Sequence, residues 1–474
     1  MGAAALLSGG CEYATYPPGS IGSFESYGCI RMHNKDPRSS VDRRHSGRRY
    51  AVTTRPEPGC RMTIEDRLLD VDAVVGGERA AANERALHQA LRRRAADVPI
   101  PRFRGSALFR SFFIGGFECS THRTRQGGRL DLISATAHDR HAEGDYRSLA
   151  AHGIRTVRDG LRWHSIETTP GWYDWSSFIP MVRAARNSET QVIWDLAHWG
   201  WPDDLDIWSS AFIDRFARFS RAAATVVRDE TDAVPFYTPV NEISFWAWAG
   251  GSLGYISPHA KGRGNELKAT LVRAAIAAIE AVKDVDARAR IVHAEPAIHV
   301  VSRSLDKRDV HAASHYTQAQ FEVLDFIAGF ARPELGGRPE YVDIVGVNYY
   351  LHNQWVDGDL PIAVNDPRHR PVRDLLADIH RRFGRPMFIA ETGIEADLRP
   401  AWLRIMGHEV AAARDAGVPI EGLCIYPVTD YPGWDDQRHC PTGLFGYADQ
   451  DGRRPTYLPL AEELARQQGR PRPL

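Results

Sequence analysis

From Ser111 onward, short apolar runs alternate with amphipathic stretches of helical length. Continuous apolar runs are typical of strands that are buried on both faces. Strands that alternate with helices form parallel sheets, and eight such units predict a (β/α)8 barrel rather than a sandwich. The expected strands are 111–118, 154–160, 191–199, 236–243, 290–298, 343–350, 386–391 and 422–428. The clearest expected helices are 208–227, 266–285, 371–383 and 399–416.

Polar side chains stand at the C-terminal ends of these apolar runs. One such residue is explained by a strand that ends in water, but nearly all eight runs end this way. In a barrel of this kind, the C-terminal ends of the strands form the rim on which active sites are built. The rim candidates are Glu118, Arg158, His198, Asn241, Glu242, Glu295, Asn348, Tyr350 and Glu391.

The composition is that of an ordinary globular protein. Of 474 residues, 43% are hydrophobic and 25% are charged, so a core can form without disulfides or a metal. The net charge of −1 provides no general attraction for nucleic acid or an anionic membrane. No apolar run approaches the roughly 18 residues of a membrane span. We therefore expect neither a nucleic-acid nor a membrane partner, and no metal or organic cofactor.

The first hundred residues differ from the rest. Residues 1–61 are rich in Gly, Ser, Pro and Arg, with nine Lys/Arg against three Asp/Glu between Arg31 and Arg61. Because no aromatic residues are regularly interleaved, a disordered basic extension is favoured over a nucleic-acid-binding arm. Residues 62–108 predict a helical linker of unknown role, broken at Gly76–Gly77, and the barrel is expected over 109–474. Six scattered cysteines and the absence of a basic signal-peptide start favour a cytoplasmic protein.

Two of the rim carboxylates, Glu242 and Glu391, form a pair of the kind that glycoside hydrolysis requires. Glycoside hydrolysis needs one carboxyl group to protonate the departing oxygen and a second to attack the anomeric carbon or activate water. Glu242 and Glu391 end the fourth and seventh expected strands, on opposite sides of one barrel mouth. A separation of about 5–5.5 Å between them would give retention of configuration, and about 6.5–9.5 Å inversion.

The segments around both glutamates resemble glycoside hydrolase family 1, the β-glucosidase family. The segment Thr238–Ile243 (TPVNEI) is similar to the family's Thr-x-Asn-Glu-Pro acid/base motif. The segment Phe388–Gly393 (FIAETG) is similar to its Ile-Thr-Glu-Asn-Gly nucleophile motif. The resemblance extends over roughly residues 109–465 and implies a retaining β-glycosidase on this barrel. Glu242 would be its acid/base and Glu391 its nucleophile.

The same resemblance implies roles for other rim residues. Arg158 would hydrogen-bond Glu391 and keep it ionised, Tyr350 would steady it, and the charge of Glu391 would raise the pKa of Glu242. Asn241 would hold the 2-hydroxyl of the sugar, and His198 would bind another hydroxyl. The remaining substrate contacts expected from the family pattern are Asn348, Trp199 and Trp434, and Glu295 is a further candidate because it ends the fifth expected strand.

Three positions depart from the family pattern. The family's first-strand Gln falls at His122, its strand-8 Trp falls at Tyr426, and the Glu that grips the outer sugar hydroxyls falls at Gly433. His122 and Tyr426 are still expected to contact the sugar, but the identity of that sugar is open. The absence of a lysine near the last strand argues against the phosphate-reading variant of the family, although Arg438 could substitute for it.

Several alternatives remain. Trp199 and Trp434 are also explained by core packing, and Glu118 and Glu295 are also explained as buried charges paired with an Arg. Gly250–Gly254 matches the Gly-x-Ser-x-Gly pattern of serine esterases, but it follows the fourth strand in a Gly-rich loop rather than on a sharp strand-to-helix turn. A transglycosidase would use the same residues with a different acceptor. A non-catalytic sugar-binding barrel would keep the fold without the chemistry.

Overall fold

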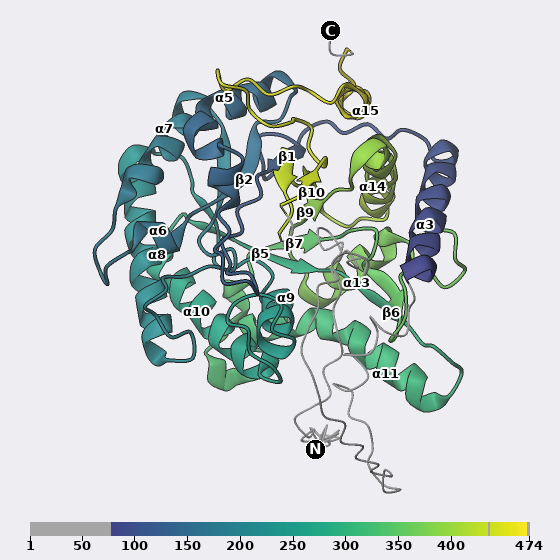
Figure 1. Cartoon of the computed structure of the whole chain (residues 1–474), viewed down its shortest axis with the longest axis horizontal. Helices are drawn as coiled ribbons and strands as arrows, with labels where there is room; N and C mark the ends of the chain where they lie inside the picture. The colour runs from purple at the N-terminus through teal and green to yellow at the C-terminus, as the bar shows by residue number, and fades with distance from the viewer. Residues whose placement is uncertain (1–76, 435–436, 472–474) are drawn as a thin grey trace, which may run out of the picture.

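The computed structural model describes residues 77–434 and 437–471. Its centre is a closed barrel of eight parallel strands in the order β1-β10-β9-β7-β5-β4-β3-β2, surrounded by helices (Figure 1). The predicted (β/α)8 barrel is therefore confirmed, and each expected run overlaps one barrel strand. The barrel strands are β1 (Phe113–Gly116), β2 (Thr156–Gly160), β3 (Gln191–Asp195), β4 (Phe236–Thr238), β5 (Arg290–Pro296), β7 (Ile344–Asn348), β9 (Met387–Thr392) and β10 (Ile420–Ile425).

Each barrel strand separates two apolar cores, because successive side chains of a strand point to opposite faces. Ile114 and Ile193 pack with side chains of other strands in the barrel interior. Their chain neighbours Phe113 and Trp194 belong to the larger core between the strands and the helices. This burial on both faces explains why the strands are continuous apolar runs.

The helices form an outer ring around the strands (Figure 1). The four clearest expected helices are found as α8 (Ser210–Glu230), α10 (Gly264–Val285), α13 (Val372–Phe383) and α14 (Arg399–Asp415). In α8 the buried positions recur every three or four residues, which gives one apolar face toward the barrel. The other barrel helices are α4 (Leu132–Ala135), α5 (His138–Ala151), α6 (Trp163–Ile166), α7 (Ile179–Asn187), α9 (Ile243–Trp246), α11 (Lys307–Gln318), α12 (Glu322–Ile327) and α15 (Leu458–Gln468). Two small sheets pair β6 (His299–Val301) with β8 (Gln354–Val356) and β11 (Tyr431–Pro432) with β12 (His439–Cys440).

Helix α3 (Gly77–Asp97) is an addition to the eight βα units and packs outside the barrel against α14 (Figure 1). Leu87 and Leu91, one turn apart, are fully buried in this contact region. The helix begins at the second glycine of the pair where a break was expected. The predicted extension 1–61 and residues 62–76 lie outside the described residues, and the division of the chain into 1–61, 62–108 and 109–474 stays a prediction.

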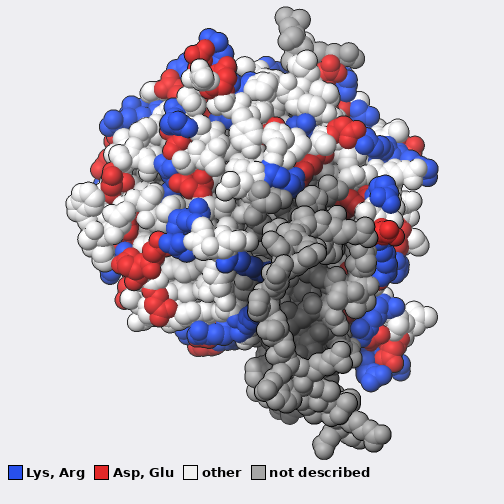
Figure 2. Space-filling view, viewed as in Figure 1, with Lys and Arg blue, Asp and Glu red and all other residues white. Residues whose placement is uncertain are grey.

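The surface and the thiols are consistent with an ordinary globular barrel. None of the described helices is long and apolar enough to cross a membrane. Basic and acidic side chains are intermixed over the face seen in Figure 2. Cys119, Cys424 and Cys440 are free and buried, and the other three cysteines lie outside the described residues.

The Gly250–Gly254 stretch is not the loop that its glycines predicted. Most of it belongs to a π-helical turn, Ala247–Ser252, that continues α9. Ser252 therefore ends a helical segment several residues after β4 and does not stand on a strand-to-helix elbow. The esterase alternative loses the structural context that its motif requires.

Candidate active site

The candidate residues gather at one end of the barrel because they lie in or directly after the C-terminal ends of its strands. Glu118 follows β1, Arg158 lies in β2, Glu242 follows β4 and Glu391 lies in β9. Their exposed fractions are at most 4%. A carboxyl group buried to this degree is costly unless it is protonated or well supplied with partners. The partners of each carboxyl group therefore indicate what it can do.

Both carboxylate oxygens of Glu391 receive a hydrogen bond. Nη1 of Arg158 donates to Oε1 over 2.6 Å, and the hydroxyl of Tyr350 donates to Oε2 over 2.8 Å. The contacts expected of Arg158 and Tyr350 are therefore present. A cationic donor on one oxygen and a hydroxyl on the other complement a negative carboxylate and fix its orientation.

Arg158 is wholly buried and links three strands of the rim. Its Nε and Nη2 donate to the two oxygens of Asp195 over 2.9 and 2.6 Å, and Nη2 also donates to Oδ1 of Asn241 over 2.6 Å. Burial raises the pKa of Asp195, but the guanidinium of Arg158 and the ring of His198 together outweigh burial and hold that pKa below its usual value. Sequence reasoning missed Asp195, although an acidic residue at the end of the apolar run QVIWD was an available signal.

Glu242 has different surroundings. Its Oε1 accepts a hydrogen bond from Nδ2 of Asn348 over 2.8 Å. Burial, and then the negative charge of Glu391, raise the pKa of Glu242 well above its usual value. The direction agrees with the effect expected from the charge of Glu391. A carboxyl group that retains its proton beside one held by a guanidinium is the division of states that an acid and a nucleophile need.

The backbone is held in an uncommon conformation at two points of the mouth. Glu242 has φ of 42° and Trp199 has φ of 63°, both in the left-handed region. Non-glycine residues adopt this region rarely, and those that do cluster at functional sites. Nε1 of Trp199 donates to the carbonyl of Asn241 over 3.0 Å, which ties the end of β3 to the residue before Glu242.

Glu295 supports the segment that follows Glu242. Its Oε1 accepts from the backbone N–H of Ile243 over 2.6 Å, and its Oε2 accepts from the backbone N–H and the hydroxyl of Ser244. Burial raises the pKa of Glu295 to about 7. The partners that the described residues provide for Glu295 are thus backbone amides and a hydroxyl, and no Arg is among them. A direct contact between Glu295 and a sugar stays a prediction.

His198 and Asn241 form a hydrogen-bonded pair. Nδ1 of His198 lies 3.2 Å from Oδ2 of Asp195, and its Nε2 lies 2.9 Å from Nδ2 of Asn241. A proton on Nδ1 satisfies both contacts, because Nδ1 then donates to the carboxylate and Nε2 accepts from the amide. The amide nitrogen of Asn241 carries a second N–H, which remains for a ligand. The sugar contacts expected of both residues stay predictions.

Three aromatic rings meet at the other side of the mouth. The ring of Trp434 lies edge-on to Trp199 at 5.0 Å and to His122 at 5.3 Å. Burial lowers the pKa of His122 to about 3, so this ring is uncharged at neutral pH. The edge-on packing accounts for part of the burial of the two tryptophans. Stacking of either one on a sugar stays a prediction.

Several buried polar atoms of the mouth have no hydrogen-bond partner within the described part of the chain. Buried polar atoms are paired in most proteins, so each exception invites an explanation. In a binding site the explanation is a ligand that supplies the partner. The unpartnered atoms are Nδ1 of His122, the hydroxyl of Tyr426, Nε1 of Trp434 and Oδ1 of Asn348.

Cys119, Asp195 and His198 bring a thiol, a carboxylate and an imidazole within the reach of one metal ion. Sγ of Cys119 lies 3.1 Å from Nδ1 of His198, and burial raises the pKa of this thiol well above its usual value. Both oxygens of Asp195 are already bound by Arg158. A cation here would face a guanidinium and would need a thiolate that burial opposes. We therefore assign the three residues to the hydrogen-bond network that supports Arg158.

Arg438, the residue expected near Gly433 as a possible phosphate ligand, is engaged in an ion pair. Nη1 and Nη2 of Arg438 donate to the two oxygens of Glu395 over 2.8 and 2.6 Å, so the charge of this arginine is matched. Oδ1 of Asp430 accepts from the backbone N–H of Gly443 over 2.8 Å. The adjacent residues 435–436 lie outside the described residues.

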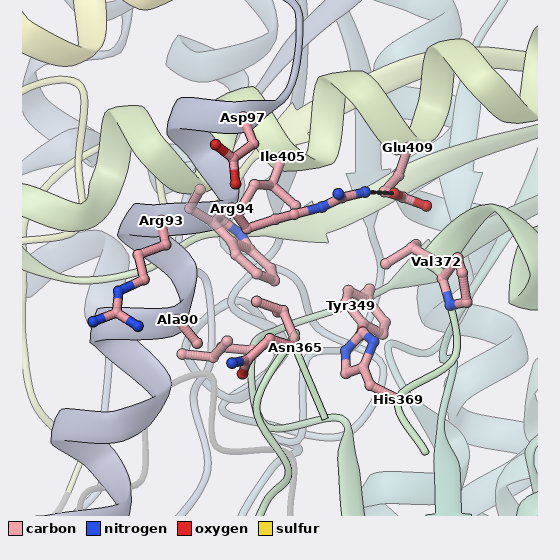
Figure 3. Close-up of a pocket in the computed structure, with 14 residues that line it drawn as sticks. Ala90, Arg93, Arg94, Asp97, Tyr349, Asn365, His369, Val372, Ile405 and Glu409 are labelled. Carbon is pink, nitrogen blue, oxygen red and sulfur yellow. Dashed lines mark ion pairs between the residues drawn. The ribbon is translucent and has the colours of Figure 1, made fainter. Parts of the chain in front are cut away.

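A second hollow, of about 390 Å³, lies on the outside of the barrel between α3, α14 and the segment 349–372. Figure 3 shows Arg94 of α3 reaching toward Glu409 of α14, and their closest atoms are 3.8 Å apart. The polar residues that line the hollow are Arg93, Arg94, Asp97, Asn365, His369 and Glu409.

The inner wall of this hollow borders the strand that carries Glu391. Tyr349 and Trp402 line the hollow, and their rings stack at 6.2 Å. The backbone N–H of Tyr349 donates to the carbonyl of Glu391 over 2.9 Å. Nε1 of Trp402 donates to the hydroxyl of Thr392 over 2.8 Å. The hollow is therefore linked to the strand that carries Glu391 through two of its lining residues.

The fold and the rim define a class of proteins, the (β/α)8 barrels that carry a pair of carboxyl groups at the C-terminal mouth. The sequence matches no family model and no curated protein. The structure, in contrast, is similar to many solved structures.

Three of the similar structures show the extent of the likeness. The AHE enzyme from Alicyclobacillus herbarius has a TM-score of 0.63 and 16% identity, covering 78% of this chain and 100% of that one. The family 1 β-glucosidase from Thermotoga maritima has a TM-score of 0.60 and 16% identity, with coverages of 75% and 98%. The virulence factor SghA, solved with its substrate analog salicin, has a TM-score of 0.62 and 17% identity, with coverages of 81% and 98%. This likeness shows that the barrel shares its fold with family 1 β-glucosidases.

Proposed function

We propose that this protein is a retaining β-glycosidase that removes a terminal β-linked sugar, with Glu391 as nucleophile and Glu242 as acid/base. The observation that carries the proposal is the contrast between the two carboxyl groups at one mouth. Glu391 is held by a guanidinium and a hydroxyl, whereas burial and the charge of Glu391 raise the pKa of Glu242. One group is prepared to attack and the other to donate a proton.

In the first step, Glu391 attacks the anomeric carbon while Glu242 gives its proton to the departing glycosidic oxygen. The C–O bond to the aglycone breaks, a glycosyl ester forms on Glu391, and the aglycone leaves as an alcohol. In the second step, Glu242, now a carboxylate, takes a proton from water as the water oxygen attacks the anomeric carbon. The ester bond breaks, Glu391 regains its charge, and the sugar leaves with its configuration retained.

The remaining rim residues bind the sugar in this proposal. Asn241 holds the 2-hydroxyl with its second amide N–H, and His198 contacts a neighbouring hydroxyl when its Nε2 exchanges the amide of Asn241 for the sugar. Asn348 orients the carboxyl group of Glu242, to which it already donates. The other proposed sugar contacts are Trp199, Glu295, His122, Tyr426 and Trp434. The Thermotoga maritima β-glucosidase was solved in complex with glucoimidazole, which supports a small β-glycoside or oligosaccharide as the substrate.

The test removes the nucleophile and replaces it with a small anion. Glu391→Ala should have no measurable turnover of nitrophenyl β-glycosides, and added azide or formate should restore activity and give a product of inverted configuration. Glu143→Ala, which removes an exposed carboxylate on α5, is the matched control and should behave as the wild type. Full activity of Glu391→Ala without an added anion would refute the assignment.

Analysis of the products tests whether water or another molecule accepts the sugar. A panel of nitrophenyl β-glucoside, β-galactoside, β-fucoside and β-glucuronide, each assayed with and without an added alcohol, separates hydrolysis from glycosyl transfer. We expect the free sugar to be the main product. A glycoside of the alcohol as the main product would identify a transglycosidase that uses the same residues.

A further inference from the structure

We propose that Glu118 is a third functional carboxyl group of this mouth, which accepts hydrogen bonds from hydroxyls of the terminal sugar and restricts the site to uncharged sugars. The inference rests on the proposed glycosidase function and refines its substrate class. It concerns a residue at a position where the sequence offered two explanations, a substrate ligand or a buried charge paired with an Arg.

The first argument is that Glu118 is buried without the partners that other carboxylates of the mouth have. Its side chain is 1% exposed. The backbone N–H of Ser120 donates to its Oε1 over 3.0 Å, and Nε2 of His198 lies 3.9 Å away, too far for a hydrogen bond. Within residues 77–434 and 437–471, no Lys or Arg forms an ion pair with Glu118. Among these described residues, the structure therefore provides no Arg partner for Glu118.

The comparison with the neighbouring carboxyl groups makes the difference clear. Asp195, Glu295 and Glu391 each have protein donors on both oxygens. An ionised carboxylate can accept about four hydrogen bonds, so Glu118 has accepting capacity that the described residues leave unused. Glu242, the proposed acid, is the other carboxyl group of the mouth with a single hydrogen-bond donor.

The second argument is electrostatic. Burial raises the pKa of Glu118, and the charge of Glu391 adds to this effect; His198 and the hydrogen bonding of Ser120 lower the pKa but do not outweigh burial. Sugar hydroxyls that donate to this carboxyl group would stabilise its charged form in place of the missing water. A bound polyol would therefore stabilise the charged form of Glu118 more than that of a carboxylate that already has donors on both oxygens.

The third argument is the chemistry of the neighbouring atoms. The hydroxyl of Tyr426 and Nε1 of Trp434 are buried donors without a partner in the described residues. The ring of Tyr426 lies 5.6 Å from the guanidinium carbon of Arg158, and burial, followed by the charge of Glu118, raises the pKa of Tyr426. A sugar hydroxyl both donates and accepts. Vicinal hydroxyls can therefore donate to Glu118 while they accept from Tyr426 and Trp434.

The same arrangement disfavours sugars that carry a negative charge. The guanidinium of Arg158 is already shared among Asp195, Glu391 and Asn241. His122 is uncharged because burial lowers its pKa to about 3. A uronic acid or a phosphorylated sugar would bring its anion toward Glu118 and Glu391, where the residues that the structure describes offer it no unshared guanidinium. Like charges in a site of low dielectric repel strongly.

The test is a comparison of Glu118→Gln with the wild type on nitrophenyl β-glycosides and on their 3-, 4- and 6-deoxy analogues. With the parent sugar, the substitution should lower kcat/KM by about 10- to 100-fold, the loss expected for hydrogen bonds to a charged group. With the analogue that lacks the contacted hydroxyl, the same substitution should change kcat/KM by less than about threefold. Glu143→Gln, on the surface, is the matched control and should change neither value.

Two results would overturn the inference. An equal loss on the parent and on every deoxy analogue would show that Glu118 acts on the fold and not on a hydroxyl. Unchanged kcat/KM of Glu118→Gln on the parent glycoside would show that it does not contact the sugar at all. A β-glucuronide provides a further readout: its kcat/KM relative to the neutral parent should rise about tenfold or more in Glu118→Gln, and no rise would contradict the charge argument.

A binding measurement keeps this test separate from the proposed function. Titration of the wild type and of Glu118→Gln with gluconolactam, an uncharged sugar lactam, should show about 10- to 100-fold weaker binding to the variant. Absence of turnover by the wild type would refute the proposed function, and the titration would still decide the role of Glu118. If Glu118→Gln fails to fold, Tyr426→Phe tests the same hydroxyl contact. It should weaken lactam binding by about three- to tenfold, and unchanged binding would refute the contact.

Discussion

The buried imidazole of His138, which lies between two aspartates, allows a direct test of the electrostatics near β2. Nδ1 of His138 lies 2.7 Å from Oδ2 of Asp145, and its Nε2 lies 2.7 Å from Oδ2 of Asp159. A carboxylate on each ring nitrogen requires a proton on both, which makes the ring a cation. The ring also stacks on Phe117 at 3.6 Å, directly before Glu118. Asp159 is the neighbour of Arg158 in β2.

The contribution of His138 to the free energy of unfolding can be calculated from the shift of its pKa. Burial lowers the pKa of His138, but the two aspartates outweigh burial and raise the pKa from 6.5 to about 9. Since the pKa is higher in the folded state, the stabilisation is fully present below about pH 6.5 and is lost as the pH rises through about 9. The difference corresponds to about 3 kcal/mol of the free energy of unfolding.

The assay is urea unfolding, followed by tryptophan fluorescence, at several pH values between 6 and 9.5. The free energy of unfolding of the wild type should exceed that of His138→Gln by about 3 kcal/mol more at pH 6 than at pH 9.5. His311→Gln, which replaces an exposed histidine on α11, should keep the pH dependence of the wild type. If His138→Gln and the wild type lose stability in parallel across this range, the assignment of a buried imidazolium is refuted.

Three further substitutions test the mouth. Tyr350→Phe removes the 2.8 Å hydrogen bond to Glu391 and should lower kcat/KM on nitrophenyl glycosides by about 10- to 100-fold; wild-type rates would show that this contact does not matter. Glu242→Gln should slow glycosides of poor leaving groups by about 10²- to 10⁴-fold and dinitrophenyl glycosides far less, and an equal loss on both would argue against a role as acid. Gly116→Ala places a methyl group 2.2 Å from the ring of Tyr426 and should lower the free energy of unfolding by about 1–3 kcal/mol; an unchanged urea midpoint would contradict this packing.

The barrel was predictable because its determinants are local. Runs such as 192–194 and 387–390 are apolar throughout, and this pattern is typical of strands that are buried on both faces. The alternation of these runs with helices such as α8 and α10 then determines a parallel sheet. The positions of Glu242 and Glu391 follow from the same pattern, because each ends or follows such a strand.

The partners of the site residues were less predictable because they are distant in the sequence. Arg158 and Glu391 are separated by 233 positions, and their contact was expected only from the family resemblance. Asp195 escaped notice because a single acidic residue at a strand end has many explanations. The partners of Glu295 are backbone amides of Ile243 and Ser244, and no sequence pattern marks a backbone amide as a partner.

The hollow lined by Tyr349 and Trp402 has a consequence for how such an enzyme can be regulated. In the proposed function the sugar reaches Glu391 from the mouth, whereas Tyr349 and Trp402 connect the strand that carries Glu391 to the hollow through hydrogen bonds to Glu391 and Thr392. A compound that occupied the hollow would meet these two side chains without competing with the sugar. Its influence on the rate would therefore persist at saturating substrate, which is the kinetic signature of a noncompetitive effector.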